Sequence, residues 1–275
     1  MLPAQLSQAQ HNTLYSPLPN LRTDVNFATK HPSNSRFVLD KRQISNWPDF
    51  EREMRTYLAK HVGNIGKSTI LKSGETFGVG NELVQARFTQ NVCHVIAEMV
   101  EELGYKVNFA DYQYGRNRRQ GQNKRKRTLI RSRRVPDIVV VHSPSHDIRI
   151  IGEIKTAWTF RPKKKQPWDE FWQLARYMDD HYCRYGFFTT YDYAWFLRRT
   201  DAYHFVISKP ISSTAHSGPA SIFVRECFNS LAIRATEGAS TAWLTMFGHE
   251  LTKCGYHPPG RTTAVSIVGQ VIAKL

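Results

Sequence analysis

Two β-branched runs around a polar connector dominate the hydrophobic pattern of the chain, at residues 135–141 and 148–154. The connector is rich in Ser, Pro and Asp, so the segment predicts a hairpin of two strands. Because successive side chains of a strand point to opposite faces, the second strand is expected to have one polar and one apolar face. The polar face carries Arg149, Ile151, Glu153 and Lys155, and the apolar face carries Ile148, Ile150, Gly152 and Ile154. We expect the apolar face to build the core.

Other segments have apolar residues at every third or fourth position, which predicts amphipathic helices. These segments are residues 47–62, 81–103, 168–182 and 220–235. Gly104 is expected to end the second helix, and Gly186 to cap the third. Further β-rich runs predict strands at residues 105–111, 185–191, 193–198, 202–211 and 264–272. Strands and helices alternate along the chain, which favours an α/β fold.

The composition divides the chain into three parts. Residues 1–45 are rich in Gln, Asn, Ser and Pro and have no sustained period, so we expect a flexible N-terminal arm. Residues 46–235 carry the regular patterns and are expected to form one folded domain. Residues 236–275 form a C-terminal extension whose pattern does not indicate a function.

Two carboxylates are expected to meet across the predicted hairpin. Asp137 begins the first strand, in phase with Val139 and Val141, and so can approach Glu153 on the second. Carboxylates held this close repel each other unless a cation lies between them, and their hard oxygens suit Mg²⁺ or Mn²⁺. Lys155 would then lie beside a metal-bound water, an arrangement able to hydrolyse a phosphodiester. The alternative is structural, since Glu-x-Lys on a strand is commonly a solvated face and Pro-Asp a turn opener.

Pro136-Asp137 followed by Glu153-Ile154-Lys155 resembles the signature of the PD-(D/E)XK nuclease superfamily. The resemblance covers about residues 80–235, where the chain also resembles nuclease-like domains of fungal proteins. It implies a restriction-endonuclease-like core, with a mixed central β-sheet flanked by helices. It also implies that Asp137, Glu153 and the backbone carbonyl of Ile154 bind the metal.

The same resemblance implies supporting residues on two helices. Glu82, near the start of the helix over 81–103, is the candidate for an additional acidic residue at the site, although the helix dipole favours an acid there in any case. Gln173 and Tyr177 lie four residues apart and share a helix face. A Gln-x-x-x-Tyr pair after the catalytic strand supports the active site in several branches of the superfamily, although such pairs are commonly structural.

The net charge of +15 and the pI near 9.8 favour a polyanionic partner, nucleic acid before membrane. Basic residues concentrate in two stretches around the predicted hairpin, at 116–134 and 161–165. The candidates for phosphate contacts are Arg118, Arg119, Lys124, Arg125, Lys126, Arg127, Lys163, Lys164 and Lys165. The first stretch is compatible with a solvated loop, a nuclear-localisation signal or a phosphate-binding arm. We favour contact with nucleic acid, with a nuclear signal as a second use.

Several other functions are disfavoured. No apolar run approaches the roughly 20 residues that cross a bilayer, and the N-terminus has no signal-peptide pattern, so we expect an intracellular protein, in the nucleus rather than the cytoplasm. The four cysteines lack metal-ligand spacing and are expected to be reduced thiols. Gly66-Lys67-Ser68 is expected to be an ordinary loop, because His61 occupies the place of the first glycine of a P-loop.

The sequence therefore predicts a Mg²⁺-dependent nuclease, with Mn²⁺ as the other candidate ion and DNA preferred over RNA as the substrate. The first alternative is a catalytically silent nucleic-acid-binding module that retains the nuclease fold. The second is a structural or partner-binding domain whose basic run is only a nuclear signal.

Overall fold

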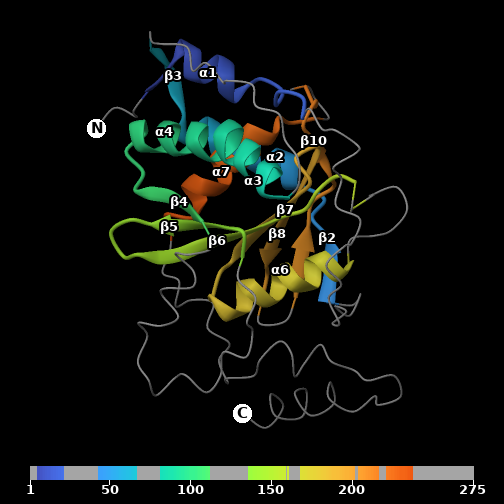
Figure 1. The fold of residues 1–275 in the computed structure, drawn as a ribbon. Helices are drawn as coiled ribbons and strands as arrows, with labels where there is room; N and C mark the ends of the chain where they lie inside the picture. Colours follow the sequence, from blue (N-terminus) through green and yellow to red (C-terminus); the bar gives the residue numbers. More distant parts are fainter. Residues whose placement is uncertain are drawn as a thin grey trace, which may run out of the picture.

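The computed structural model describes residues 5–21, 43–66, 81–111, 136–158, 160, 168–201, 204–216 and 221–237. Within these ranges the chain forms a mixed, largely antiparallel eight-stranded sheet with helices on both faces, which confirms the predicted α/β class (Figure 1). The strands are β2 (Ile44–Asn46), β4 (Val107–Asp111), β5 (Ile138–His142), β6 (Asp147–Ile154), β7 (Tyr185–Thr189), β8 (Tyr193–Arg199), β9 (Phe205–Ile207) and β10 (Ile211–Ser212).

The strand order is β2-β9-β8-β7-β6-β5-β4, and β10 pairs with β8. The predicted hairpin is present, because β5 pairs antiparallel with β6. Strand β6 then runs parallel to β7, and helix α6 (Trp168–Asp180) makes the crossover between them. The strand predicted over 202–211 is instead divided into β9 and β10, which both pair with β8.

Helices cover both faces of the sheet. One face carries α2 (Phe50–His61), α3 (Asn81–Phe88), the π-helical turn η3 (Thr89–Cys93), α4 (His94–Glu102) and α7 (Val224–Arg234), and α6 covers the other (Figure 1). The helix predicted over 81–103 is thus continuous but contains one π-helical turn. It ends as predicted, with Gly104 at a positive φ of 82°.

Strand β6 is buried on both faces, and this corrects the predicted division of its side chains. The pairing with β5 shifts by one residue between Val140 and Val141, a β-bulge that leaves Arg149 as the extra residue. Ile148 therefore lies with Ile151 in the core under α6, while Ile150 lies in the opposite core, so the prediction that Ile148 and Ile150 share a face is wrong. The face that was expected to be polar is covered by α6.

The prediction that Gly186 caps α6 is also wrong. The chain turns after α6 at Tyr182, which has a positive φ of 57°, and Gly186 lies inside β7. A Cβ atom on Gly186 would lie 2.6 Å from the sulfur of Met178 on α6. The glycine is therefore needed for the close approach of helix and strand, not for the turn.

The predicted flexible arm is wrong for residues 5–21. Strand β1 (Gln5–Ser7) pairs parallel with β3 (Gly63–Gly66), and α1 (Gln8–Leu14) follows, capped by the hydroxyl of Ser7. Leu6, Leu14 and Leu18 are buried in the core formed with α4 and α7. Apolar spacing was too sparse to predict this docking, because the partners come from distant parts of the chain.

Polar contacts also fasten residues 5–21 to the domain. The guanidinium of Arg225 donates to the Ser16 hydroxyl at 2.9 Å, and the Tyr191 hydroxyl donates to the Pro19 carbonyl at 2.8 Å. The short strand β3 replaces part of the loop expected around Gly66. Residues 67–68 and the C-terminal extension after residue 237 lie outside the described residues.

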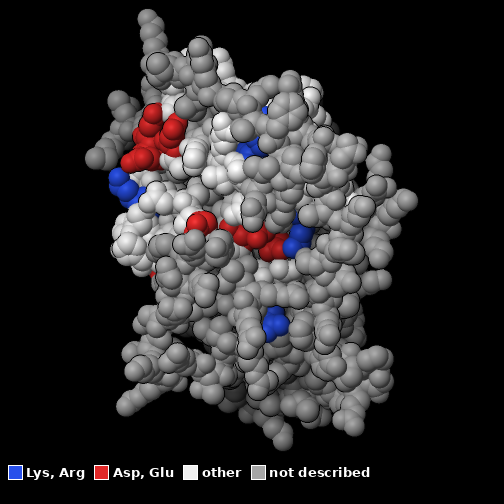
Figure 2. Space-filling view, in the orientation of Figure 1, with Lys and Arg blue, Asp and Glu red and all other residues white. Residues whose placement is uncertain are grey.

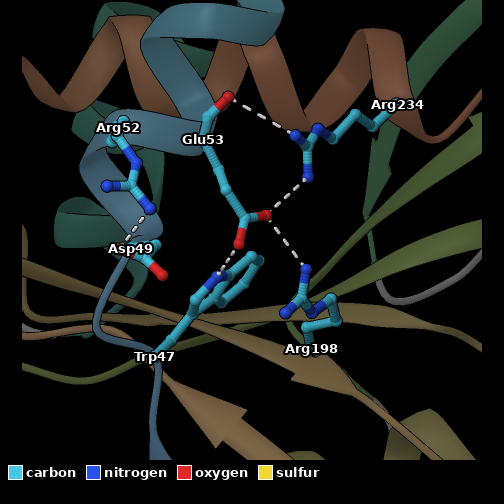
Figure 3. Close-up of polar contacts among 6 residues, drawn as sticks. All are labelled: Trp47, Asp49, Arg52, Glu53, Arg198 and Arg234. Atoms are coloured by element: carbon cyan, nitrogen blue, oxygen red, sulfur yellow. Dashed lines mark hydrogen bonds and ion pairs between the residues drawn. The ribbon is translucent and has the colours of Figure 1, made fainter.

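An ion network joins α2, β8 and α7 on the face of the sheet that carries α2 and α7 (Figure 3). The Glu53 carboxylate accepts from Trp47 Nε1 at 2.9 Å, from Arg198 at 3.0 Å and from Arg234 at 3.3 Å. The Arg198 guanidinium also lies 4.0 Å from the centre of the Trp47 ring. Three elements distant in sequence are thereby held around one carboxylate.

Candidate active site

Asp137 lies directly before β5, where the hairpin opens. Ile138 pairs with Gly152, so the next position along the register places Asp137 opposite Glu153, as the sequence predicted. The Asp137 N–H donates to the Gly152 carbonyl at 3.1 Å, and Asp137 Oδ2 accepts from the Ile154 N–H at 2.8 Å. Both the backbone and the carboxylate of Asp137 are thus fixed to β6.

Glu153 is a buried carboxylate with charged and polar partners. Only 2% of the residue is exposed. Its Oε1 accepts from Lys155 Nζ at 2.5 Å and from the Gln173 amide at 2.9 Å. A carboxylate buried this deeply needs such partners, because removing its charge from water is costly. The side chain of Lys155 is 18% exposed, so the pair lies at the boundary between core and solvent.

Burial raises the pKa of the Asp137 carboxyl above its usual value, and the Ile154 N–H and the charge of Lys155 act in the opposite direction. Lys155 therefore acts on the pKa of Asp137 and is also bonded to Glu153. Two acidic groups and one cation therefore gather at the same end of β5 and β6.

Helix α6 supplies the residues that hold Glu153 in place. The Gln173 amide nitrogen donates to Glu153 Oε1 and also lies 2.9 Å from the Tyr177 hydroxyl, to which it donates. Tyr177 is 1% exposed. The structure therefore brings both predicted helix residues to the site. Gln173 contacts Glu153 directly, and Tyr177 contacts Gln173.

Helix α3 approaches the same place from the opposite side of the sheet. Glu82 lies in its first turn, and the position of its side chain is outside the described part of the structure. Three residues later the Gln85 amide donates to the Asp137 carbonyl at 3.0 Å. Gln85 was not predicted from the sequence, where its signal is its place one turn after Glu82 on the helix.

The donor atoms suit a divalent ion of the Mg²⁺ type. Among the described residues, no group of three or more His, Cys, Asp and Glu side chains gathers that could hold a metal. Asp137 and Glu153 provide two carboxylates. The backbone of Ile154 points to the Asp137 side of β6, because N–H and C=O of one strand residue point the same way and this N–H bonds Asp137. Mg²⁺ commonly binds through one or two carboxylates and retains several waters, so this set fits it.

The basic residues proposed to contact phosphates, at 116–134 and 161–165, lie outside the described residues. Of the 38 Lys and Arg residues, the described ranges contain 14, against 19 Asp and Glu residues, a formal charge of −5. Among the described residues on the face drawn in Figure 2, acidic side chains lie over α4 and at the level of the sheet, and the basic ones are scattered. The excess positive charge of the chain belongs to segments other than those described.

No described helix is both long and apolar enough to span a bilayer. Comparison of the chain with protein-family models, with curated proteins and with solved structures found no match.

Proposed function

We propose that the protein is a metal-dependent nuclease that hydrolyses phosphodiester bonds, with DNA as the preferred substrate. One observation carries the proposal: Asp137 is bonded to Gly152 and Ile154, the residues on either side of Glu153, and Lys155 is bonded to Glu153. A purely structural charge pair would need one acid and one base. Here a second, partly buried carboxylate, that of Asp137, accompanies them, and burial raises its pKa.

Asp137, Glu153 and the Ile154 carbonyl would hold Mg²⁺ or Mn²⁺ in this function. When bound, the ion supplies a Lewis acid and lowers the pKa of a coordinated water. Lys155 orients the attacking water or stabilises negative charge on the phosphate, since its ammonium is partly exposed beside the carboxylates. Gln173 keeps the Glu153 carboxylate oriented, and Tyr177 supports Gln173.

The basic segments would supply the grip on nucleic acid. One segment, 116–134, ends three residues before Asp137, and the other, 161–165, begins six residues after Lys155. Contacts of Lys and Arg with phosphates release counterions, so binding must weaken steeply as salt increases. A nuclear location accords with the same basic residues serving as an import signal.

The test is cleavage of circular and linear plasmid by purified protein with Mg²⁺, Mn²⁺ or chelator. Loss of the circular form that requires the ion is expected, and Lys155→Met should abolish it. Lys60→Met, on the exposed surface of α2, is the matched control and should cleave like the unaltered protein. Salt-sensitive binding with no ion-dependent cleavage would refute the nuclease and favour the silent binding module. The absence of any binding would favour the partner-binding alternative.

A further inference from the structure

Gln85 reaches the candidate site from the face of the sheet opposite α6. Its neighbours on α3, Val84 and Phe88, are fully buried in the core shared with α4 and α7, so the helix is firmly seated there. The Gln85 side chain is only half-buried and extends to the Asp137 carbonyl, to which its amide donates at 3.0 Å. Gln85 and Asp137 are 52 positions apart in the chain, so no local sequence pattern dictates this contact.

The contact completes the fixation of Asp137. Within the described residues, β4 pairs with β5 as far as Asp111, opposite Ile138. The Gln85 amide donates to the carbonyl of the next residue, Asp137. Asp137 is then held at its N–H by Gly152, at its carboxylate by Ile154 and at its carbonyl by Gln85. The first two contacts both come from β6, and the contact with Gln85 comes from a different element.

We propose that Gln85 is a positioning residue that fixes the backbone of Asp137 and thereby sets the affinity of the site for its divalent ion. This inference rests on the proposed function, because the ion is the ligand in question. The geometry of an ion site depends on where each carboxylate lies, and residues that orient a metal ligand typically change metal affinity about 10–100-fold when they are removed. Gln85 acts on the backbone and makes one neutral hydrogen bond, so a smaller effect of roughly three- to tenfold is expected.

The experiment measures ion binding separately from cleavage. The thermal unfolding midpoint is recorded against increasing Mg²⁺ and Mn²⁺ for the unaltered protein, Gln85→Met and Gln8→Met. Methionine retains the length of glutamine and its helix propensity but lacks the donor. Gln8 is exposed on α1 and bonds Asn12, so Gln8→Met is the matched control. Gln85→Ala serves as a second variant if Gln85→Met folds poorly.

Gln85→Met should need roughly three to ten times more ion for half of the maximal stabilisation, and Gln8→Met should need the same amount as the unaltered protein. Its plasmid cleavage should be weakened at low ion concentration and restored at high concentration, unlike that of Lys155→Met. A structural role alone would lower the ion-free midpoint and leave the ion requirement unchanged, and that result would overturn the inference while the nuclease proposal stands. If the unaltered protein shows no ion-dependent stabilisation, the proposed ion site fails, and the inference fails with it.

Discussion

Replacing Lys155 with methionine tests the electrostatics of the candidate site without relying on cleavage. Lys155→Met removes the ammonium but keeps an unbranched side chain of similar length. The ammonium lies 2.5 Å from Glu153 Oε1, and Glu153 is only 2% exposed. The substitution therefore leaves a buried carboxylate without its nearest cation, and the protein should become less stable in the absence of divalent ions.

The structure sets the size of the effect. At an effective dielectric constant of about 20, charges 2.5 Å apart attract by about 7 kcal/mol, but the desolvation of both groups opposes most of this. Breaking a buried pair typically costs about 3–5 kcal/mol. Because Lys155 is 18% exposed and Gln173 still donates to the same oxygen, the lower end is expected, about 3 kcal/mol.

A divalent ion should reverse part of this loss. In the unaltered protein the ion must compete with the ammonium for Glu153, and in the variant it does not. If the variant binds the ion tenfold more tightly, a saturating concentration stabilises it by about 1.4 kcal/mol more than the unaltered protein. Lys155→Met should therefore bind the ion better and yet cleave nothing.

Urea unfolding followed by tryptophan fluorescence, in chelator and in Mg²⁺, measures both quantities, with Lys60→Met as the control. Equal free energies of unfolding for Lys155→Met and the unaltered protein in chelator would refute the buried-pair reasoning. An equal gain from Mg²⁺ in both proteins would show that the ion does not bind at Glu153.

Three further predictions concern other contacts of the fold and the site. Glu153→Gln should retain the fold, as judged by circular dichroism, and lose both ion-dependent stabilisation and cleavage; persistent stabilisation would place the ion elsewhere. Gly152→Ala should lower the free energy of unfolding in urea by about 3 kcal/mol, because a Cβ there would lie 2.1 Å from the ring of Phe187, and a small change would mean that the ring has room to move. Glu53→Gln should cost about 1 kcal/mol at pH 7, a modest figure because the carboxylate is partly exposed and screened. Burial acts to raise the pKa of Glu53, but a hydrogen bond and two arginines outweigh it and lower the pKa below 4.5, so the stability difference is present above that value and is lost as the pH falls through the lowered pKa. A difference that persists at lower pH in urea titrations would contradict this assignment.

The helices and strands of the central part of the fold, and the phase of the site residues, were predictable from the sequence because they depend on local periodicity. The hairpin of β5 and β6 follows from two β-branched runs, and its register places Asp137 opposite Glu153. Helical spacing likewise predicts that Gln173 and Tyr177 share a face. These relations span few residues, so the geometry of one or two elements fixes them.

Tertiary packing decided the features that periodicity cannot determine. The bulge at Arg149 moves Ile148 to the face of β6 that carries Ile151, and the side expected to be polar is buried because α6 lies over it. Gly186 allows the close approach of α6 and β7. Only packing reveals that Met178 of α6 occupies the space that a Cβ atom on residue 186 would need.

The sequence by itself determined that two carboxylates and a lysine would lie in phase on neighbouring strands. The tertiary structure decided which side chains hold them: Gln173 from the helix on one face and Gln85 from the helix on the other. The physical reason is that an isolated strand specifies the direction of its side chains, whereas their burial and partners depend on elements that the chain brings together only after folding.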